Sequence, residues 1–286
     1  MKILCQYGKK KTHGKLIGAS QVKCRSPPME NAGPVALRIT YEGAGEQAGS
    51  DSTTFTYYET PIVESIDPPC GPDYGYTQIT VSGKHFVETA FGKAKCVFNQ
   101  THFMNATIVN ENTIKCSTPI LPPDAAGLPP KYQHYVVQVT LNERDFSDSV
   151  SRVQFAYYPD PHITATKDAN VGPVTGGTTS NLTGIGFTHP NVCKLRVRYG
   201  AIEVTPSSVE SDSNIITKSP AVNVPDAVVL AASGNGQQYS DDVTLHYRDV
   251  ENTFTYHQDS FIHILHPQYG PDSGNTKIMV SGIGFK

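Results

Sequence analysis

The chain has 286 residues, more than one ordinary domain holds, so two or three separate cores are expected. It contains 21 Pro, 24 Gly and no Trp, which favours short strands joined by frequent turns over long helices. A formal net charge of -3, with no basic block longer than residues 8–15, excludes the electrostatic footprint of a nucleic-acid-binding protein.

Alternation of apolar and polar residues indicates strands along the whole chain. The clearest runs are TQITVSG at 77–83, HYVVQVTL at 134–141 and DDVTLHY at 241–247. Apolar residues seldom recur at helical spacing for more than one turn. No apolar stretch approaches the roughly 18 residues needed to cross a bilayer, and residues 1–7 indicate a strand instead of a signal peptide. These patterns predict an all-β protein.

Taken in chain order, the predicted strands fall into four groups. Residues 1–59 hold the later strands of a sandwich, in LCQYGKK, QVKCRSPP, VALRITYEG and TFTYY. Residues 60–159 and 160–259 each hold a complete set, and residues 260–286 hold the opening strands of a further set. The sequence therefore predicts two complete domains with a partial domain at each end.

A closing strand with its first aromatic at Phe55, Phe155 and Phe254 links the first three groups, and two further landmarks show that the last three groups are copies of one unit. One is a Gly-Pro turn and the other a strand-ending glycine before an aromatic; they fall at Gly71, Gly172 and Gly270, and at Gly83, Gly184 and Gly282. The spacings are 101 and 98 residues for both landmarks. A repeat of this length is the size of a sandwich of about seven short strands. We expect the glycines to supply turns with positive φ or close strand packing.

The final segment repeats the buried pattern of a strand. Within 77–83 the alternation places Ile79 and Val81 inward, and Ile278 and Val280 do the same in TKIMVSG, which leads to Phe285. Two interpretations stay open. Either the segment belongs to a longer array of such domains, or Ile278, Val280 and Phe285 belong to an inter-subunit strand that completes the 1–59 half-domain of the next molecule.

A wider motif order carries a family resemblance. The order is a turn with GP followed by GG or YT, and then strands with the motifs SG..F, C.(F/Y)G, (I/V).C.(S/T)P and F.Y, in which a dot stands for any residue. This order resembles the IPT/TIG family, immunoglobulin-like domains found in plexins, scatter-factor-type receptors and some transcription factors. The resemblance implies tandem early-set immunoglobulin-like β-sandwiches engaged in protein contacts. The 160–259 unit departs from it, since Val197 and Lys218 stand where the others have cysteines.

Six cysteines bear on the compartment. Cys5 and Cys24 are 19 residues apart, Cys96 and Cys116 are 20 apart, and both pairs occupy the same strand positions of their repeats. We expect two equivalent disulfides; the alternative is two pairs of buried, reduced thiols. Cys70 and Cys193 have no counterparts, and the sequence leaves their state open.

Three N-x-Ser/Thr motifs predict N-glycans at Asn99, Asn105 and Asn181. Asn181 aligns with the outward-facing Thr80. Asn99 falls in a turn, where Asn is also favoured for its tolerance of the left-handed conformation. Disulfides and glycans together predict an extracellular or cell-surface protein.

Catalytic and metal-binding patterns are missing from the sequence. No G-x-S-x-G occurs, and His263 and His266 would point to opposite faces of a strand. We expect no enzyme activity, cofactor or metal site. The sequence predicts a structural array that forms a surface stalk or filament, with copies of itself or adjoining IPT/TIG domains as end-to-end partners and no membrane span in this segment. The alternative is a receptor or adhesion ectodomain that binds a protein ligand, for which residues 119–135 would form an atypical long loop.

Overall fold

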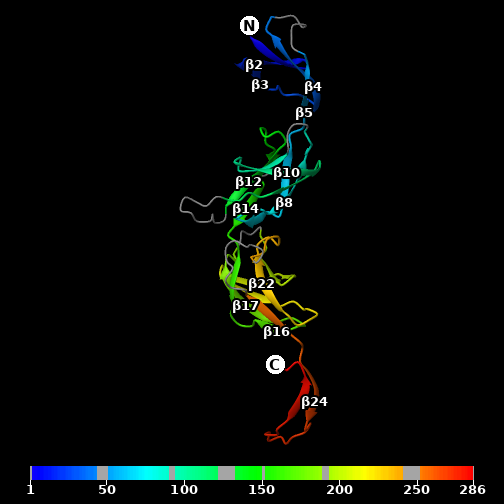
Figure 1. Cartoon of the computed structure of the whole chain (residues 1–286), viewed down its shortest axis with the longest axis vertical. Helices are drawn as coiled ribbons and strands as arrows, with labels where there is room; N and C mark the ends of the chain where they lie inside the picture. The colour runs from blue at the N-terminus through cyan, green and yellow to red at the C-terminus, as the bar shows by residue number, and fades with distance from the viewer. Residues whose placement is uncertain are drawn as a thin grey trace.

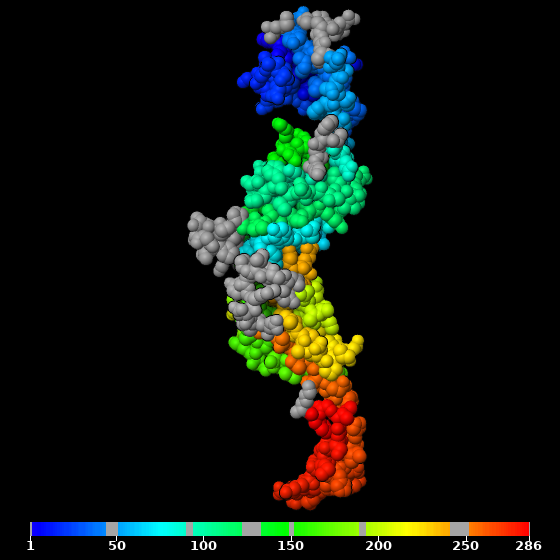
Figure 2. Space-filling view, in the orientation of Figure 1, coloured from blue at the N-terminus to red at the C-terminus, as the bar shows by residue number. Residues whose placement is uncertain are grey.

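The computed structural model describes residues 2–43, 51–89, 94–121, 133–149, 152–188, 193–240 and 252–285. Every regular element in these ranges is a β-strand, so the all-β fold class is confirmed. The strands form successive groups along one long axis (Figures 1 and 2). The N-terminus lies near one end of the molecule, and the last strands form the other end, where the chain turns back so that the C-terminus lies near the third group (Figure 1). No helix in the described ranges is long and apolar enough to span a membrane.

The first unit is a single antiparallel sheet in the order β3-β2-β1-β4-β5. Its strands are β1 (Ile3–Tyr7), β2 (Lys10–Gly18), β3 (Gln21–Cys24), β4 (Gly33–Tyr41) and β5 (Thr53–Tyr57). One face carries a ring cluster: Phe55 lies edge-on to Tyr7 and Tyr57, with centroid distances of 5.4 and 4.9 Å. The buried side of the sheet is therefore the side of Cys5 and Tyr7.

The second unit is a sandwich whose layers are joined through one long strand. Its strands are β6 (Ile62–Asp67), β7 (Cys70–Pro72), β8 (Gln78–Lys84), β9 (Lys95–Phe98), β10 (His102–Asn110), β11 (Thr113–Ser117), β12 (His134–Thr140), β13 (Asp148–Ser149) and β14 (Gln154–Tyr158). β10 pairs with β9 through residues 102–105 and with β11 through residues 106–110, so it passes from one layer to the other. β7 pairs with β14 in parallel.

The third unit repeats this plan with the long strand broken in two. A four-stranded sheet runs β15-β17-β21-β20 and a five-stranded sheet runs β16-β23-β22-β18-β19. The strands are β15 (His162–Thr166), β16 (Val171–Pro173), β17 (Thr179–Ile185), β18 (Arg196–Tyr199), β19 (Ile202–Val204), β20 (Ser208–Ser211), β21 (Asn214–Lys218), β22 (Ala227–Ser233) and β23 (Thr253–His257). β16 pairs with β23 in parallel, as β7 does with β14.

The last described strands form a hairpin of β24 (Phe261–His266) and β25 (Met279–Ile283), labelled the terminal hairpin here. Ile278 and Val280, which were expected to point into a core, are exposed in this chain, as is Phe285. Their predicted pairing with a neighbouring molecule stays a prediction.

The recurring glycine before an aromatic has a steric cause. A Cβ on Gly83 would overlap the carbonyl oxygen of Ile62 and the ring of Phe86. The same two kinds of overlap recur at Gly184, with His162 and Phe187, and at Gly282, with Phe261 and Phe285. Only glycine lets the opening strand of each unit and the following aromatic ring approach this closely. Gly75 and Gly176 instead have positive φ, 75° and 76°.

The departure of the third unit lies one residue from where the sequence places it. β8 pairs Ile79 with Cys116, and β17 pairs the equivalent Ser180 with Thr217. Thr217 is therefore the counterpart of Cys116, and Lys218 is exposed. Thr217 is fully buried, and its hydroxyl lies 2.6 Å from the hydroxyl of Tyr199. A buried hydrogen bond thus stands where the second unit has a disulfide.

Candidate functional site

In the described ranges, no group of three or more His, Cys, Asp or Glu side chains is placed to hold a metal ion. The features that single out this molecule lie where one unit meets the next. We define the first joint as residues 58–61 with their surroundings, and the second joint as residues 159–161 with theirs.

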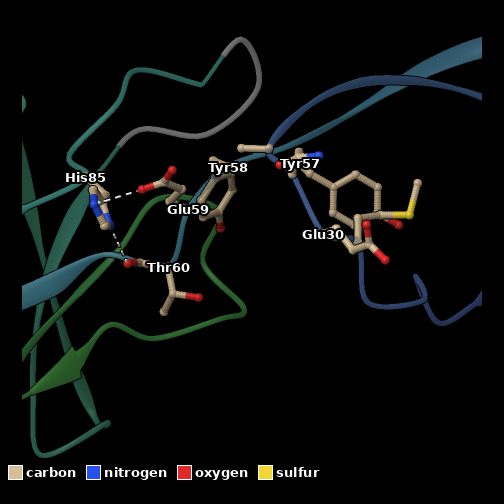
Figure 3. Close-up of a pocket in the computed structure, with 9 residues that line it drawn as sticks. Glu30, Tyr57, Tyr58, Glu59, Thr60 and His85 are labelled. Carbon is tan, nitrogen blue, oxygen red and sulfur yellow. Dashed lines mark hydrogen bonds and ion pairs between the residues drawn. The ribbon is translucent and has the colours of Figure 1, made fainter.

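The first joint encloses an open pocket of about 410 Å³ (Figure 3). Its wall on the side of the first unit is the segment Met29–Ala32 together with Tyr57, and the linker Tyr58–Thr60 and His85 complete it. A smaller pocket of about 180 Å³ adjoins it and reaches Asn142, Asp145 and Phe146 of the second unit. The first joint is thus a crevice between stacked units.

His85 fixes the linker at the edge of this pocket. Its Nε2 lies 2.8 Å from a carboxylate oxygen of Glu59, and its Nδ1 lies 3.1 Å from the carbonyl oxygen of Thr60 (Figure 3). His85 thus ties the linker to the second unit through both ring nitrogens. The backbone of His85 has a φ of 63°, which turns its ring back toward the linker.

One loop lies at each joint and belongs to the unit that follows the joint in the chain, and the two loops are equivalent. These joint loops are residues 140–147 of the second unit and 233–240 of the third. In each, an asparagine Oδ1 accepts hydrogen bonds from the backbone N–H groups two and three residues ahead. The acceptors are Asn142, at 3.0 and 2.9 Å, and Asn235, at 2.9 and 3.3 Å. This Asx-type turn orders each loop before it meets its neighbour.

At the second joint the loop 233–240 binds the second unit through side-chain amides. The Gln237 amide forms two hydrogen bonds with the backbone of Gln78, accepting from its N–H at 3.0 Å and donating to its C=O at 2.9 Å. The Gln238 amide donates to the carbonyl of Gly75 and to the hydroxyl of the fully buried Thr77, at 3.1 and 3.0 Å. Asn235 donates to the carbonyl of Cys70 at 3.3 Å.

The same loop is anchored firmly on its own unit. The hydroxyl of Tyr239 donates to the carboxylate of Glu203 on β19. The guanidinium of Arg198 on β18 lies 4.3 Å from the centre of the Tyr239 ring, within the range of a cation–π contact. The loop therefore contacts the second unit through Gln237 and Gln238, and β18 and β19 of its own unit through Tyr239.

A covalent bond also crosses the second joint. A disulfide joins Cys70 at the start of β7 to Cys193 of the third unit, with Cα atoms 6.0 Å apart. Cys70 packs with the buried Ala156 and Tyr158, and Cys193 lies against this cluster. The sequence left both cysteines open, and the structure pairs them across the two units.

The linker of the second joint contains a half-buried aspartate, Asp160, whose Oδ1 atom is buried. Burial, and secondly the charge of nearby Asp73, raise the pKa of Asp160 to about 7. Burial, and secondly the charge of Asp160, raise the pKa of the Tyr158 hydroxyl well above its ordinary value. The joint is therefore sensitive to the charge on Asp160.

The four predicted disulfide cysteines lie in two pairs. Cys5 is bonded to Cys24 and Cys96 to Cys116, with Cα separations of 6.3 and 6.4 Å. Each bond joins the two strands that flank a middle strand, β2 or β10. The residue opposite the second cysteine of each pair is small, Gly14 or Ala106, which leaves room for the bond to pass.

The predicted glycosylation residues differ in their surroundings. Asn99 is exposed, has a φ of 48° and accepts a hydrogen bond from the N–H of Val136 through Oδ1 at 2.7 Å. Asn105 is exposed on β10, whereas Asn181 is half-buried on β17 with a buried Oδ1 atom. Of the long loop predicted at 119–135, residues 122–132 lie outside the described residues.

Sequence reasoning missed the joint loops, although a signal for them exists. Residues 142–147 read NERDFS and residues 235–240 read NGQQYS, so an Asn, an aromatic and a Ser recur with a spacing of 93. That spacing is shorter than the hundred-residue repeat and falls between strands, where a search for strand landmarks does not look. Cys70 and Cys193 carried a signal as well, because each lacks a counterpart and they belong to adjacent units.

Comparison with known protein families assigns the second unit. The family model described as IPT/TIG domain matches residues 61–157. Residues 61–157 are therefore similar to an IPT/TIG domain. The matched range lies inside the predicted 60–159 domain, and the resemblance derived from the motif order is confirmed.

The curated relatives are plexins. The chain is 28% identical over 201 residues to Plexin A3 of Danio rerio and 25% identical over 224 residues to Plexin-A3 of Homo sapiens. These alignments cover 69% and 76% of this chain but only 10% and 12% of the relatives. The chain is accordingly an extracellular or cell-surface protein, and the expected localisation is confirmed.

Solved structures with related architecture include the full extracellular region of Plexin A4, domains 1 to 10. That structure has a TM-score of 0.43 and is 15% identical in sequence. The alignment covers 98% of this chain and 28% of the plexin chain. The FN1–FN3 domains of chicken CNTN1 have a TM-score of 0.30 and are 12% identical in sequence. The alignment covers 83% of this chain and 86% of the CNTN1 chain.

Proposed function

We propose that this chain is a stiff spacer within a receptor-type ectodomain, in which stacked IPT/TIG sandwiches hold other parts of the receptor at a fixed separation. The observation that carries the proposal is the second joint, where a disulfide and the amide hydrogen bonds of one loop tie two sandwiches together. A spacer needs no catalytic group, in keeping with the expected lack of enzyme activity.

The linkers support this role because they are short and contain proline. Only residues 159–161 separate β14 from β15, and only residues 58–61 separate β5 from β6. Pro159, Pro161 and Pro61 restrict the backbone of these linkers. A hinge motion would have to be absorbed by very few bonds.

The receptor interpretation is the alternative of the two functions that the sequence predicts, and the curated relatives favour it. The filament interpretation stays a prediction, for which the exposed apolar residues of the terminal hairpin would supply the contact. The two interpretations differ in one measurable property, which is whether the isolated chain polymerises.

Sedimentation velocity and negative-stain electron microscopy of the secreted chain separate them. The spacer proposal predicts discrete elongated monomers at micromolar concentration, with the second and third units in one constant relative orientation. Particles in which these two units take many orientations would overturn it. Regular filaments that disappear in a Val280→Lys variant would instead establish the filament, since Val280 lies on the exposed hairpin face.

A further inference from the structure

On β10, the predicted glycosylation motif at Asn105 lies beside an exposed aromatic side chain, which the other two motifs lack. Residues 103, 105 and 107 along this strand are exposed, while Met104, Ala106 and Ile108 pack against the core. Because side chains alternate along a strand, Phe103, Asn105 and Thr107 stand side by side on one outer face. The acceptor Asn and the required Thr of the Asn-Ala-Thr motif therefore share that face with an aromatic ring.

The ring of Phe103 is presented outward and held in place. Its side chain is 41% exposed, which is high for a phenylalanine in a sandwich. Its centroid lies 6.1 Å from that of Phe146, which supports the ring from one side. On the neighbouring strand β9, the residue opposite Asn105 is Lys95, which is paired with Glu143 at 2.8 Å. The neighbour of Asn105 on β9 is therefore a charged residue, whereas Phe103, two residues before Asn105 on β10, is an apolar neighbour.

The two other motifs lack such a ring and serve as internal controls. Two residues before Asn99 is Val97, which is fully buried, and two residues before Asn181 is Thr179. An apolar partner for a sugar at this relative position therefore exists at Asn105 alone among the three motifs.

We propose that Asn105 carries an N-glycan whose first sugar packs its apolar C–H face on the ring of Phe103. Attachment takes place in the secretory pathway, consistent with an extracellular protein. The Nδ2 atom of Asn105 bonds to the anomeric carbon of a lipid-pyrophosphate-linked oligosaccharide, Nδ2 loses one proton, and the lipid pyrophosphate leaves. The sugar then covers part of an exposed apolar ring, and burial of apolar area stabilises the folded unit.

Site occupancy is the first test. The full chain is secreted from a glycosylating eukaryotic host, the glycans are released enzymatically in ¹⁸O water, and peptide mass spectrometry reads the label at each asparagine. The proposal predicts that Asn105 is occupied. An unmodified Asn105 in secreted, folded protein would overturn it.

Contact between the sugar and the ring is the second test. The glycans are trimmed to a single N-acetylglucosamine, and the proton resonances of that ¹³C-labelled sugar are compared with those of the same sugar on an unstructured peptide of residues 101–109. If the sugar on Asn105 packs on the ring of Phe103, its proton resonances shift upfield through the ring current, and these shifts vanish in the Phe103→Leu variant. Shifts equal to those of the peptide would contradict the contact.

A thermodynamic cycle gives an independent readout. The trimmed wild type, Phe103→Leu, Asn105→Gln and the double variant are compared by calorimetry. We expect the sugar to raise the melting temperature of the second unit by about 4 °C, and the gain to be absent when Leu replaces Phe103. An equal gain with either residue would show that the ring does not contribute.

Discussion

At the scale of single residues, one tyrosine hydroxyl is used in the same way in all three units. The hydroxyl groups of Tyr57, Tyr157 and Tyr256 donate to the carbonyl oxygens of Pro27, Pro119 and Pro220, at 3.0, 3.2 and 2.9 Å. In each unit the bond fastens the closing strand to the turn that follows an earlier strand. The contact repeats although the cysteines around it do not.

Removal of this hydroxyl should weaken the second unit. Tyr157→Phe leaves the carbonyl of Pro119 without its donor in a buried environment, which costs about 1 kcal/mol of the free energy of unfolding. Urea denaturation followed by circular dichroism measures the change. Tyr76→Phe, at a side chain that is 63% exposed, is the control and should change little. Equal effects of the two substitutions would contradict the assignment.

The raised pKa of Asp160 predicts that the stability of the folded protein depends on pH. Its pKa is raised to about 7 in the folded joint, so the folded state binds its proton more tightly than the unfolded chain does. The stabilisation from the protonated form is complete below the ordinary pKa of about 4, and is lost as the pH rises toward 7.

Asp160→Asn retains the shape of the side chain and removes the charge. We expect this variant to melt higher than the wild type at pH 8, with a smaller difference at pH 4. Differential scanning calorimetry at both pH values measures the two differences. The same difference at both values would show that the carboxyl of Asp160 is not the titrating group.

At the scale of elements, the closing glycine of the opening strand is a packing requirement. Gly83→Ala places a methyl group where the carbonyl of Ile62 and the ring of Phe86 already lie, so we expect a loss of several kcal/mol or failure to fold. Gly18→Ala in β2 meets no atom within 4 Å and should be neutral or mildly stabilising. Chemical denaturation of both variants tests the contrast; a harmless Gly83→Ala would refute the steric account.

The joint loop 233–240 makes a prediction of its own. Gln237→Ala removes the side-chain acceptor of the Gln78 N–H, so this N–H should exchange faster with solvent. Amide hydrogen exchange measured by NMR at Gln78 tests this. The control is Gln100→Ala, whose amide contacts Gln138 within the second unit. Unchanged exchange at Gln78 in the Gln237 variant would mean that the loop does not hold the second unit.

The strands and the repeat were predictable from sequence because they rest on local alternation and on landmarks that recur in phase. Ile79 and Val81 are buried as the alternation requires. The counterpart of Cys116 was misplaced by one residue, at Lys218 instead of Thr217, because a linear alignment does not see which residues pair across strands. The joints were not predictable, since Cys70 meets Cys193 only after both sandwiches have formed.

At the scale of the whole molecule, the contacts of the two joints differ in kind. At the first joint the linker residues Glu59 and Thr60 contact His85 beside an open pocket. At the second joint a disulfide, a buried tyrosine and a preordered loop connect the units directly. The molecule is therefore expected to be stiffest between its second and third units.

Residual dipolar couplings of the full, oxidised chain test this claim most directly. Backbone N–H couplings from described strands of the second and third units are each fitted to an alignment tensor. The account predicts that one tensor, of the same magnitude and orientation, fits both units. Two tensors of different magnitude would show that the units move independently and would contradict the claim that the second joint makes them one rigid body.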